Sequence, residues 1–507
     1  MPSFDPYKIR DNFPVLLPEE AARWDTISIE KYQVSSKILM ANAALSVFQH
    51  IRRKDWFLST KEFHFLLGPG NNGGDGYALA YYMATSFYAM RTLPRIILWE
   101  LKETPSNDGS YFKNLLLQIP NIEWKKLEHF CNEFQLEDKH TVIIDALFGT
   151  GFSREIQEPI ASCLQHANKS KAYRIAMDIP SGVFGNGNFF SHEAFLAHET
   201  HTFGSYKIAH LLEPGILYAG RVYVHPIGFF YKETDPEFSF LSRGKILKKT
   251  SWKKSRDLSA HKYRSGKLIL LGGSTGMEGA AILAAKSFLK AGGGIVRLFS
   301  ESPTTKQVLK DFPEIMIRSG NPDDLCELAL SELEQSAQST SLLIGPGLGF
   351  FPNETFWNKL SKTLGKKALI LDGSVLNESL STMATYFSSD MRIYMTPHAA
   401  EASRLLRQKI MNIREAALSI CKNFKADVYI KGPGGIVVQK ESLPKEIYVN
   451  SKLSRLAVAG TGDVFAGLLA FSAIHEVDVW QATFSRYFAA AKKAGENLTP
   501  SDLINHI

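Results

Sequence analysis

The sequence predicts an α/β protein of two domains, each with a parallel sheet between layers of helices. Three observations predict this class: the chain length, a repeated order of strand, glycine-rich loop and helix, and one break in that order. With 507 residues, the chain is too long for one typical hydrophobic core. Its composition, 45% apolar and 21% charged residues, is ordinary for a globular protein.

Short β-rich runs that end in glycine or aspartate recur along the chain, with helical stretches between them. They are FHFLLGPG at 63–70, TVIIDALFG at 141–149, YRIAMDIPSG at 173–182, KLILLGGS at 267–274, SLLIGPGLG at 341–349, ALILDGS at 368–374 and DVYIKGPGG at 427–435. Alternating β and α elements with apolar strands favour parallel, doubly wound sheets. Such sheets bind ligands at the carboxyl ends of their strands, where the glycines and aspartates collect here.

The α/β order breaks at residues 228–256, which are charged and aromatic, and a fresh series begins at 261. We therefore predict two different domains, 1–240 and 241–507. The basic stretch at 243–256 is interpreted as a solvated linker. Its basic residues are not interleaved with aromatic residues in a helix or strand pattern, which disfavours nucleic-acid binding.

Charge and cysteine content exclude several classes of protein. The net charge of +7 is mild for this length. The four cysteines are scattered without a CxxC pair, so their pattern predicts neither a zinc site nor a disulfide framework. The N-terminus has no signal-peptide pattern, and no run of about 18 apolar residues occurs. The sequence thus predicts a cytoplasmic protein with no membrane or nucleic-acid partner.

The first domain carries a polar, glycine-rich segment, NNGGDG at 71–76, directly after a strand-like run. The apolar segment 77–90 is a good helix candidate, so we expect 71–76 to be a loop that leads into a helix N-terminus. Free N–H groups and the helix dipole favour anions there, such as the phosphate of a nucleotide or sugar. The alternative is a turn with capping side chains, but the segment is longer and more polar than a turn needs.

Two aspartates of this domain stand where apolar strands end: Asp145 closes TVIID and Asp178 closes RIAMD. Each alone could cap a helix or turn, but two of them and NNGGDG converge on one sheet edge. A carboxylate, an amide oxygen and the Ser181 hydroxyl suit a hard cation. A second, partly desolvated carboxylate could move protons. Lys207 is either part of this site or an ordinary solvent-exposed lysine.

The motifs GPGNNGGDG, DALFGTGFSRE, DIPSG and TFGSYKIAHLLEPG occur in this order. Over residues 20–235 they resemble the N-terminal epimerase domain of the bifunctional NAD(P)H-hydrate repair enzymes. The resemblance implies a Rossmann-like three-layer αβα domain. It also implies interconversion of the R and S forms of hydrated NADH and NADPH (NADHX and NADPHX), with Asp178 transferring the proton. A potassium ion would be held by Asn72, Asp145 and Ser181.

The same resemblance implies which residues contact the substrate of the epimerase. They are Asn71, Asn72, Gly73, Gly74, Asp75, Gly149, Thr150, Gly151, Phe152, Ser153, Arg154, Glu155 and Asp178. One departure is visible in LMANAA at 39–44, where the family usually has a glutamate and this chain has Ala41. Any role of that acid is therefore in doubt here.

The second domain contains AGTGDVFAG at 459–467, another glycine loop before an apolar helix. Asp463 at the first turn could simply cap the helix. Gly460, Thr461 and Gly462 also offer a run of accessible N–H groups, which a cap does not need. A base beside an anion hole is what phosphoryl transfer to a hydroxyl requires.

This loop resembles the ribokinase-like superfamily, which implies a second αβα domain, and companion motifs narrow the resemblance. In order, they are the segment 261–298, GPGLG at 345–349, LDGSVLN at 371–377, TPHAAEASRLL at 396–406, KGPGG at 431–435 and GTGD at 460–463. Over about 250–500 the chain looks like the ADP- or ATP-dependent NAD(P)H-hydrate dehydratase domain. Both domains in this order resemble the bifunctional repair enzymes.

The implied dehydration begins with phosphoryl transfer from ADP or ATP to the ring hydroxyl, with Asp463 as base. Phosphate then leaves readily, whereas hydroxide would not. Magnesium is expected, because phosphoryl transfer usually needs its charge. The implied hydrate site is Ala280, Gly349, His398 and Asp463, and the implied nucleotide site is Lys431, Gly432, Pro433, Gly434, Gly435 and Gly462.

Three departures concern this second site. Relatives tend to read TPHPGE, whereas Ala399 and Ala400 stand here, which predicts a less rigid loop. Gly435 replaces a frequent threonine, and DGS at 372–374 replaces a DAD-type sequence. Two alternatives stay open: a small-molecule kinase with a regulatory N-terminal domain, and a non-catalytic scaffold. A homo-oligomer is expected.

Overall fold

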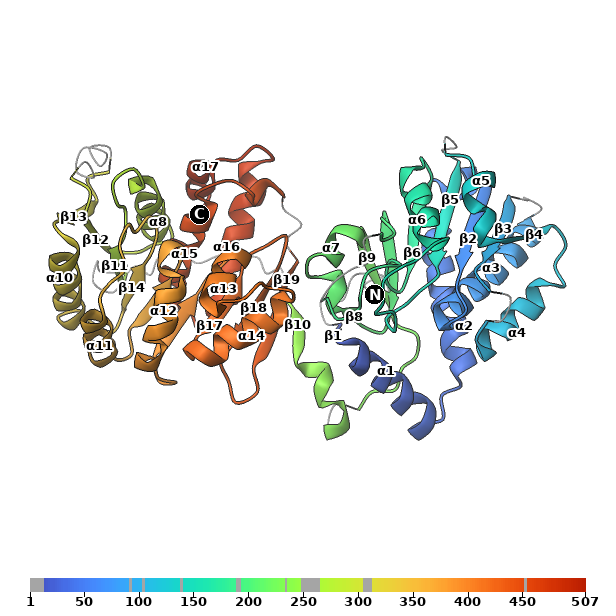
Figure 1. Ribbon diagram of the computed structural model, residues 1–507, viewed down its shortest axis with the longest axis horizontal. Helices are drawn as coiled ribbons and strands as arrows, with labels where there is room; N and C mark the ends of the chain where they lie inside the picture. The colour runs from blue at the N-terminus through green and yellow to red at the C-terminus, as the bar shows by residue number, and fades with distance from the viewer. Residues whose placement is uncertain are drawn as a thin grey trace, which may run out of the picture. The chain divides into compact units, whose positions relative to one another are not determined.

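The computed structural model divides into two compact units, Met1–Ile246 and Leu247–Ile507, called here the first and second unit (Figure 1). Most of the basic stretch interpreted as a linker lies outside the described residues. The structure describes residues 13–90, 94–102, 105–136, 140–187, 193–232, 235–247, 265–303, 312–450 and 454–507.

The main sheet of the first unit is fully parallel, in the order β4-β3-β2-β5-β6-β7-β9. Its strands are β2 (Glu62–Leu67), β3 (Arg95–Glu100), β4 (Ile122–Lys126), β5 (Thr141–Ala146), β6 (Tyr173–Met177), β7 (Glu199–Phe203) and β9 (Arg221–His225). The longer helices are α1 (Pro18–Thr26), α2 (Ser36–Ile51), α3 (Asn71–Met90), α4 (Asn107–Leu116) and α6 (Ile160–Lys169). Shorter elements are β1 (Val15–Leu16), paired with β8 (Tyr206–Lys207), and α5 (Phe130–Glu133), α7 (Gly215–Tyr218) and β10 (Gly244–Ile246).

Both faces of this sheet are covered, which explains why its central strands β2 and β5 are mostly apolar. Phe63, Phe65 and Leu67 of β2 belong to a core with α2 and α3. Leu66, which alternates with them, belongs to a second core with α5 and α6. This arrangement of a sheet between helices confirms the predicted α/β class for the first half of the chain.

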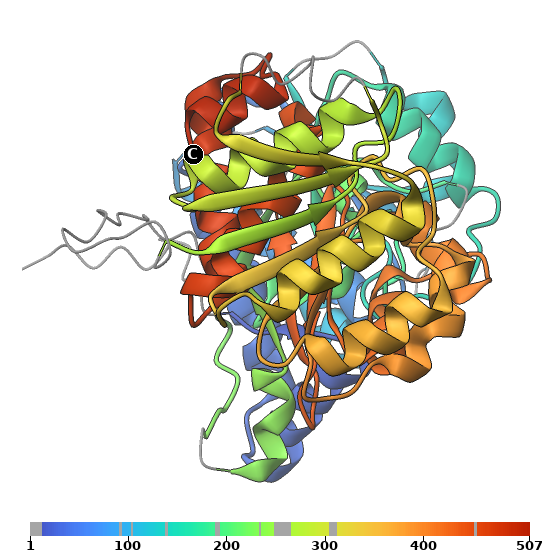
Figure 2. The ribbon, with the colours of Figure 1, turned by 90° about the vertical axis from the view of Figure 1, so that its left-hand side faces the viewer.

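The second unit has strands in the order β19-β18-β17-β16-β15-β14-β11-β12-β13. They are β11 (Lys267–Leu271), β12 (Ile295–Ser300), β13 (Ile315–Ser319), β14 (Thr340–Ile344), β15 (Ala368–Leu371), β16 (Arg392–Met395), β17 (Asp427–Ile430), β18 (Gly434–Gln439) and β19 (Lys445–Asn450). The helices are α8 (Glu278–Lys290), α10 (Pro322–Glu334), α11 (Glu354–Thr363), α12 (Glu378–Met383), α13 (Ala399–Leu406), α14 (Ile413–Phe424), α15 (Thr461–His475), α16 (Val479–Ala494) and α17 (Pro500–Asn505). Figure 2 shows this sheet with helices on both faces, which confirms the α/β class here too.

The second sheet differs from the prediction at one side. β17, β18 and β19 pair antiparallel, whereas every pair from β17 to β13 is parallel. KGPGG therefore does not lead from a strand to a helix. Lys431, Gly432 and Pro433 form the turn of a β-hairpin, and short glycine-containing connections favour such a hairpin over a crossover.

Apolar side chains of α8, α15 and α16 form the main core on one face of the second sheet, together with residues of β11, β12 and β14. The packing of α8 against α15 is close, because a Cβ at Gly467 would lie 2.0 Å from the carbonyl oxygen of Ala284. This contact holds the middle of α15 close against α8. No helix in the described part of the chain is long and apolar enough to cross a membrane.

Candidate functional site

The first unit contains a cavity of about 740 Å³ at the carboxyl ends of its parallel strands. Ten of the residues that the sequence predicts for the epimerase substrate line it: Asn71, Asn72, Asp75, Gly149, Thr150, Gly151, Phe152, Ser153, Arg154 and Asp178. Three others, Gly73, Gly74 and Glu155, are not among its lining residues. The apolar wall includes Trp24, Leu39, Met40 and Phe229.

The segment NNGGDG is not a loop, because α3 already begins at Asn71. Packing explains the inner glycines without a ligand. A Cβ at Gly73 would lie 1.8 Å from the carbonyl oxygen of Gly68, so the helix can sit this close to the end of β2 only if residue 73 has no side chain. A Cβ at Gly74 would lie 2.5 Å from Cε of Met40, at the end of a flexible side chain of α2. The glycines thus bring Asn71, Asn72 and Asp75 to the cavity without themselves facing it.

Asn72, Asp145 and Ser181, the predicted potassium ligands, gather around the peptide of Phe148. Asn72 Nδ2 donates to the Phe148 carbonyl oxygen at 2.9 Å, and the Ser181 hydroxyl accepts from the Phe148 N–H at 3.0 Å. Asp145 accepts from the Ser181 N–H and hydroxyl, each at 2.7 Å. Asn72 Oδ1 is buried and has no hydrogen-bond partner among the described residues. Burial raises the pKa of Asp145 to about 6, although these hydrogen bonds act to lower it.

Asp178 is held by an ion pair in a strained backbone conformation. Its φ is +59°, in the left-handed region that few non-glycine residues adopt. Its Oδ1 accepts from Lys207 Nζ at 2.7 Å and from the Thr202 hydroxyl at 2.9 Å, and its peptide N–H donates to the His201 carbonyl oxygen. Burial acts to raise the pKa of Asp178, but the ammonium group of Lys207 outweighs it and the pKa is lowered. Lys207 is buried and lines the cavity, so it belongs to the site rather than to the solvent-exposed surface.

Asp25 of α1 also lines this cavity, and sequence reasoning missed it. Desolvation raises the pKa of Asp25, Lys207 opposes the shift and the charge of Asp178 adds a smaller increase, and the resulting pKa is about 6. Desolvation likewise raises the pKa of Asp75, and the charges of Asp178 and Asp25 add smaller increases. Ala41, at the position of the family's glutamate, packs against the core rather than lining the cavity. The cavity thus combines one ionised carboxylate with two that hold protons more tightly.

In the second unit, Asp463 lies in the first turn of α15. The helix follows directly after Gly460, whose φ of +94° is accessible to glycine. Desolvation and, to a smaller extent, the charge of Asp372 raise the pKa of Asp463, while Lys431 opposes the shift, and the resulting pKa is about 7. A carboxylate with a pKa near neutrality can accept a proton from a hydroxyl and later release it.

Lys431 lies beside this helix start, since its Nζ would be 3.6 Å from a Cβ at Gly462. It donates to Asp372 Oδ1 at 2.7 Å, and the Thr396 hydroxyl donates to the same oxygen at 2.6 Å. Desolvation opposes the charge of Lys431, but Asp372 outweighs it and the pKa of the lysine is raised. The sequence drew attention to DGS only as a departure and did not identify Asp372 as the partner of Lys431.

His398 has a structural role at the N-terminus of α13. Its Nδ1 accepts from the N–H groups of Ala400 and Glu401, and Glu401 Oε2 accepts from the His398 N–H at 2.9 Å. With this reciprocal capping, Ala399 and Ala400 form the first turn of a helix rather than a loop, and the expected lower rigidity of this segment stays a prediction. His398 Nε2 lies 3.4 Å from Glu401 Oε1.

The remaining predicted residues lie in several different elements of the second unit. The Gly349 N–H donates to the Ser274 hydroxyl, and Ala280 lies in the first turn of α8. A Cβ at Gly345 would lie 1.6 Å from the carbonyl oxygen of Asp372, so GPGLG packs directly on DGS. Pro433 is exposed at the tip of the hairpin turn, whereas Gly434 is buried in β18.

Gly435 is also buried in β18, where a Cβ would lie 2.5 Å from Cε2 of Tyr429. The Tyr429 ring is itself packed against Phe465 and Phe484, with ring centroids 5.3 and 4.9 Å apart. The tyrosine therefore occupies the space that a side chain at position 435 would need.

The first α/β unit has a cavity lined by carboxylates and a lysine. The second unit has an aspartate at a helix start, beside another lysine. These features define an enzyme with two separate sites that act on small molecules. The family model described as YjeF-related protein N-terminus matches residues 36–209, and that described as NAD(P)H-hydrate dehydratase matches residues 268–505. The chain belongs to the family of bifunctional NAD(P)H-hydrate repair enzymes, which confirms the resemblance noted in the sequence.

Individual relatives cover nearly the whole chain. The bifunctional NAD(P)H-hydrate repair enzyme Nnr of Thermofilum pendens is 29% identical and covers 97% of this chain and 94% of its own length. That of Dictyoglomus turgidum is 27% identical, with 90% and 88% covered. The structure of the ADP/ATP-dependent NAD(P)H-hydrate dehydratase from Bacillus subtilis, co-crystallized with ATP and Mg²⁺, is 19% identical, covers 50% of this chain and 91% of that chain, and gives a TM-score of 0.41. The family assignment rests on the sequence matches.

Proposed function

We propose that this chain repairs hydrated NADH and NADPH in two steps. The first unit interconverts the R and S hydrates, and the second unit dehydrates the S form with ADP or ATP. The observation that carries the proposal is the pair of separate carboxylate sites, above all Asp463 with a pKa of about 7 at the start of α15.

In the dehydration step, Asp463 accepts the proton of the ring hydroxyl, and the oxygen attacks the terminal phosphoryl group of the nucleotide. N–H groups at the start of α15, including that of Gly462, point at the transferring charge, and Lys431 supplies a positive charge beside them. The ring C–O bond then breaks with loss of phosphate, and the neighbouring carbon loses a proton to restore the double bond.

Magnesium fits this site by the chemistry of its donors. Asp372 and Glu401 are buried carboxylates whose charges act on Asp463, and Mg²⁺ is usually bound by one or two carboxylates together with phosphate oxygens. Bound there, the ion would neutralise charge on the transferred phosphoryl group. The hairpin residues Lys431–Gly435 are proposed to hold the nucleotide, and Ala280, Gly349 and His398 the hydrate.

In the epimerisation step, Asp178 is proposed to exchange a proton with the hydrated ring, while Lys207 fixes the orientation and charge of its carboxylate. A hard monovalent cation such as K⁺ fits beside it, because Asn72 Oδ1 is a buried oxygen without a partner among the described residues, and Asp145 and Ser181 add further oxygens. The ion would supply positive charge for the dinucleotide.

The test uses hydrated NADH that contains both epimers. The return of the dihydropyridine absorbance is followed with and without ADP or ATP, in the presence of magnesium and potassium. Complete recovery that depends on nucleotide supports both activities. Recovery of only the S fraction contradicts the epimerase proposal, and no recovery contradicts the dehydratase proposal.

A small-molecule kinase is the second candidate, because an aspartate beside the N–H groups of a helix start also suits phosphorylation of a hydroxyl. The products separate the two: a kinase leaves a stable phosphorylated compound, whereas the dehydratase leaves NADH and free phosphate. The retained Asp145 and Asp178 argue against a scaffold, which needs neither. The cytoplasmic location and the homo-oligomer remain predictions.

A further inference from the structure

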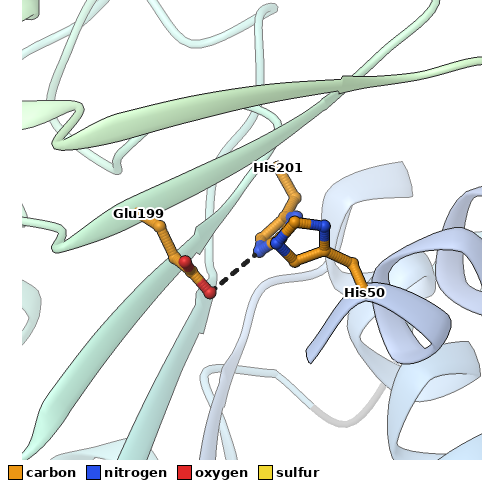
Figure 3. A group of neighbouring side chains, drawn as sticks. All are labelled: His50, Glu199 and His201. Atoms are coloured by element: carbon orange, nitrogen blue, oxygen red, sulfur yellow. Dashed lines mark hydrogen bonds and ion pairs between the residues drawn. The ribbon is translucent and has the colours of Figure 1, made fainter. Parts of the chain in front are cut away.

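The first unit contains a second cluster of polar side chains that the repair reaction does not use. His50 near the end of α2 and Glu199 and His201 of β7 each offer one ligand atom, and these three atoms lie within 4.8 Å of one another (Figure 3). Glu199 and His201 are 1% and 0% exposed, and His50 is partly buried. None of the three lines the epimerase cavity.

The local structure explains how the cluster forms. Glu199 and His201 are two residues apart in a strand, so their side chains share one face of the sheet. Figure 3 shows His50 reaching this face from the neighbouring helix, with its ring beside that of His201. His201 Nε2 and Glu199 Oε1 are 3.3 Å apart, which brings a nitrogen and an oxygen ligand together.

His50 is the member of this cluster with a ring nitrogen that lacks a hydrogen-bond partner among the described residues. Its Nε2 is buried and has no hydrogen-bond partner within the described ranges of the chain. A buried polar atom without a partner is costly unless something else satisfies it. Metal ions bind the neutral form of imidazole through such a free nitrogen.

The groups around the cluster orient it for a cation. His201 Nδ1 lies 2.8 Å from His225 Nε2, and a metal-binding histidine usually has such a partner on its other nitrogen. Lys54 donates to Glu199 Oε2 at 2.9 Å, which leaves Oε1 facing the histidines. The tautomer of His201 that carries its proton on Nδ1 would donate to His225 Nε2 and leave His201 Nε2 free to bind a metal ion.

We propose that His50, Glu199 and His201 form a binding site for a divalent transition-metal ion, with zinc as the best fit. Two imidazoles and one carboxylate are ligands that zinc accepts in tetrahedral geometry, with water as the fourth ligand. The ion ties α2 to β7. Both elements also line the epimerase cavity, through Leu39, Met40 and Phe203, so the metal would stabilise its walls. This inference does not depend on the proposed function.

The first experiment titrates the untagged, metal-free full chain with Co²⁺, which gives visible absorption bands in a tetrahedral site. We expect one equivalent to bind with these bands and zinc to displace it. His50→Gln should weaken binding at least tenfold, because it removes one ligand near a helix end without altering the sheet. His129→Gln is the matched control, because His129 is an exposed histidine whose Nε2 is 3.7 Å from Glu128. This variant should bind cobalt as tightly as the unmodified chain does.

A second measurement is independent of any variant. X-ray absorption at the zinc edge of the unmodified chain should show nitrogen and oxygen neighbours at about 2.0–2.2 Å, with the signature of two imidazoles. Absence of one-equivalent cobalt binding, equal binding by His50→Gln, or a zinc shell without two imidazoles would each overturn the proposal.

Discussion

Each unit holds one aspartate with a lysine close by, but the two lysines act on different carboxylates. In the first unit, Lys207 contacts Asp178 itself, so the pKa of Asp178 is lowered despite burial. In the second unit, Lys431 contacts Asp372, and Asp463 is left with desolvation and negative neighbours that raise its pKa to about 7. The position of one ammonium group therefore decides whether a buried aspartate stays ionised or exchanges protons near neutral pH.

The largest expected effect comes from Asp463→Asn, which removes the proton acceptor from the second unit only. Dehydration should fall by roughly 10²–10⁴-fold, the usual contribution of a general base, while epimerisation is unchanged. Both rates are measured on one preparation, with circular dichroism to establish folding. If a folded variant loses both activities, the two sites are not independent and the comparison fails.

Asp178→Asn is the reciprocal change in the first unit. It should slow epimerisation to a similar extent and leave dehydration of the S form intact, so a mixed pool of hydrates recovers only partway on a fast timescale. Absorbance recovery after adding nucleotide measures this directly. Full, fast recovery of the mixed pool would remove Asp178 from the mechanism.

Lys207→Met tests the ion pair that sets the pKa of Asp178. Removing one partner of a buried pair leaves an unpaired charge, so the free energy of unfolding should fall by about 3–5 kcal/mol. The double variant Lys207→Met with Asp178→Asn should regain part of this loss, as measured by urea unfolding. A double variant that loses the sum of the two single effects would show that the pair is not coupled.

The pH dependence of the two activities should also differ between the units, by a smaller factor than the substitutions at Asp463 and Asp178 produce. Asp463 must be ionised to accept a proton, so with a pKa of about 7 the dehydration rate should rise about tenfold from pH 6 to pH 8 and then level off. Asp178, with a lowered pKa, stays ionised over this range, so epimerisation should not share that inflection. Nucleotide binding at each pH serves as control, and a flat dehydration profile would refute the assignment of Asp463.

The smallest effect concerns stability rather than catalysis. Gly435→Thr should cost about 1–3 kcal/mol, because a buried Cβ at this position meets the packed ring of Tyr429. Thermal unfolding measures the cost, and Tyr429→Val is expected to offset part of it in the double variant. An unchanged melting temperature in Gly435→Thr would mean that the ring moves aside freely.

The sequence was sufficient for those features that follow from local pattern. Strand ends marked by Asp145, Asp178 and Asp372 lie at the carboxyl edges of parallel sheets, as alternating β and α elements require. The start of α3 was misplaced, because the glycines of NNGGDG were interpreted as ligand contacts. Gly73 is instead required by the backbone of Gly68, a tertiary contact that no local pattern reveals.

Residues that act through long-range contacts were harder to find. Asp25 reaches the first site from a helix with no motif around it, and Lys207 could not be separated from a surface lysine until its burial was known. The cluster of His50 and His201 joins residues that are 151 positions apart in sequence. Only the pairing of β7 with its neighbours and the packing of α2 bring such residues together.

The contact between Gly435 and Tyr429 also makes these two positions depend on each other. A Cβ at position 435 would lie 2.5 Å from Cε2 of Tyr429, so a larger residue there requires the ring to shift or to be replaced by a smaller side chain. The identity of residue 435 is therefore tied to that of residue 429, although neither residue is proposed to be catalytic.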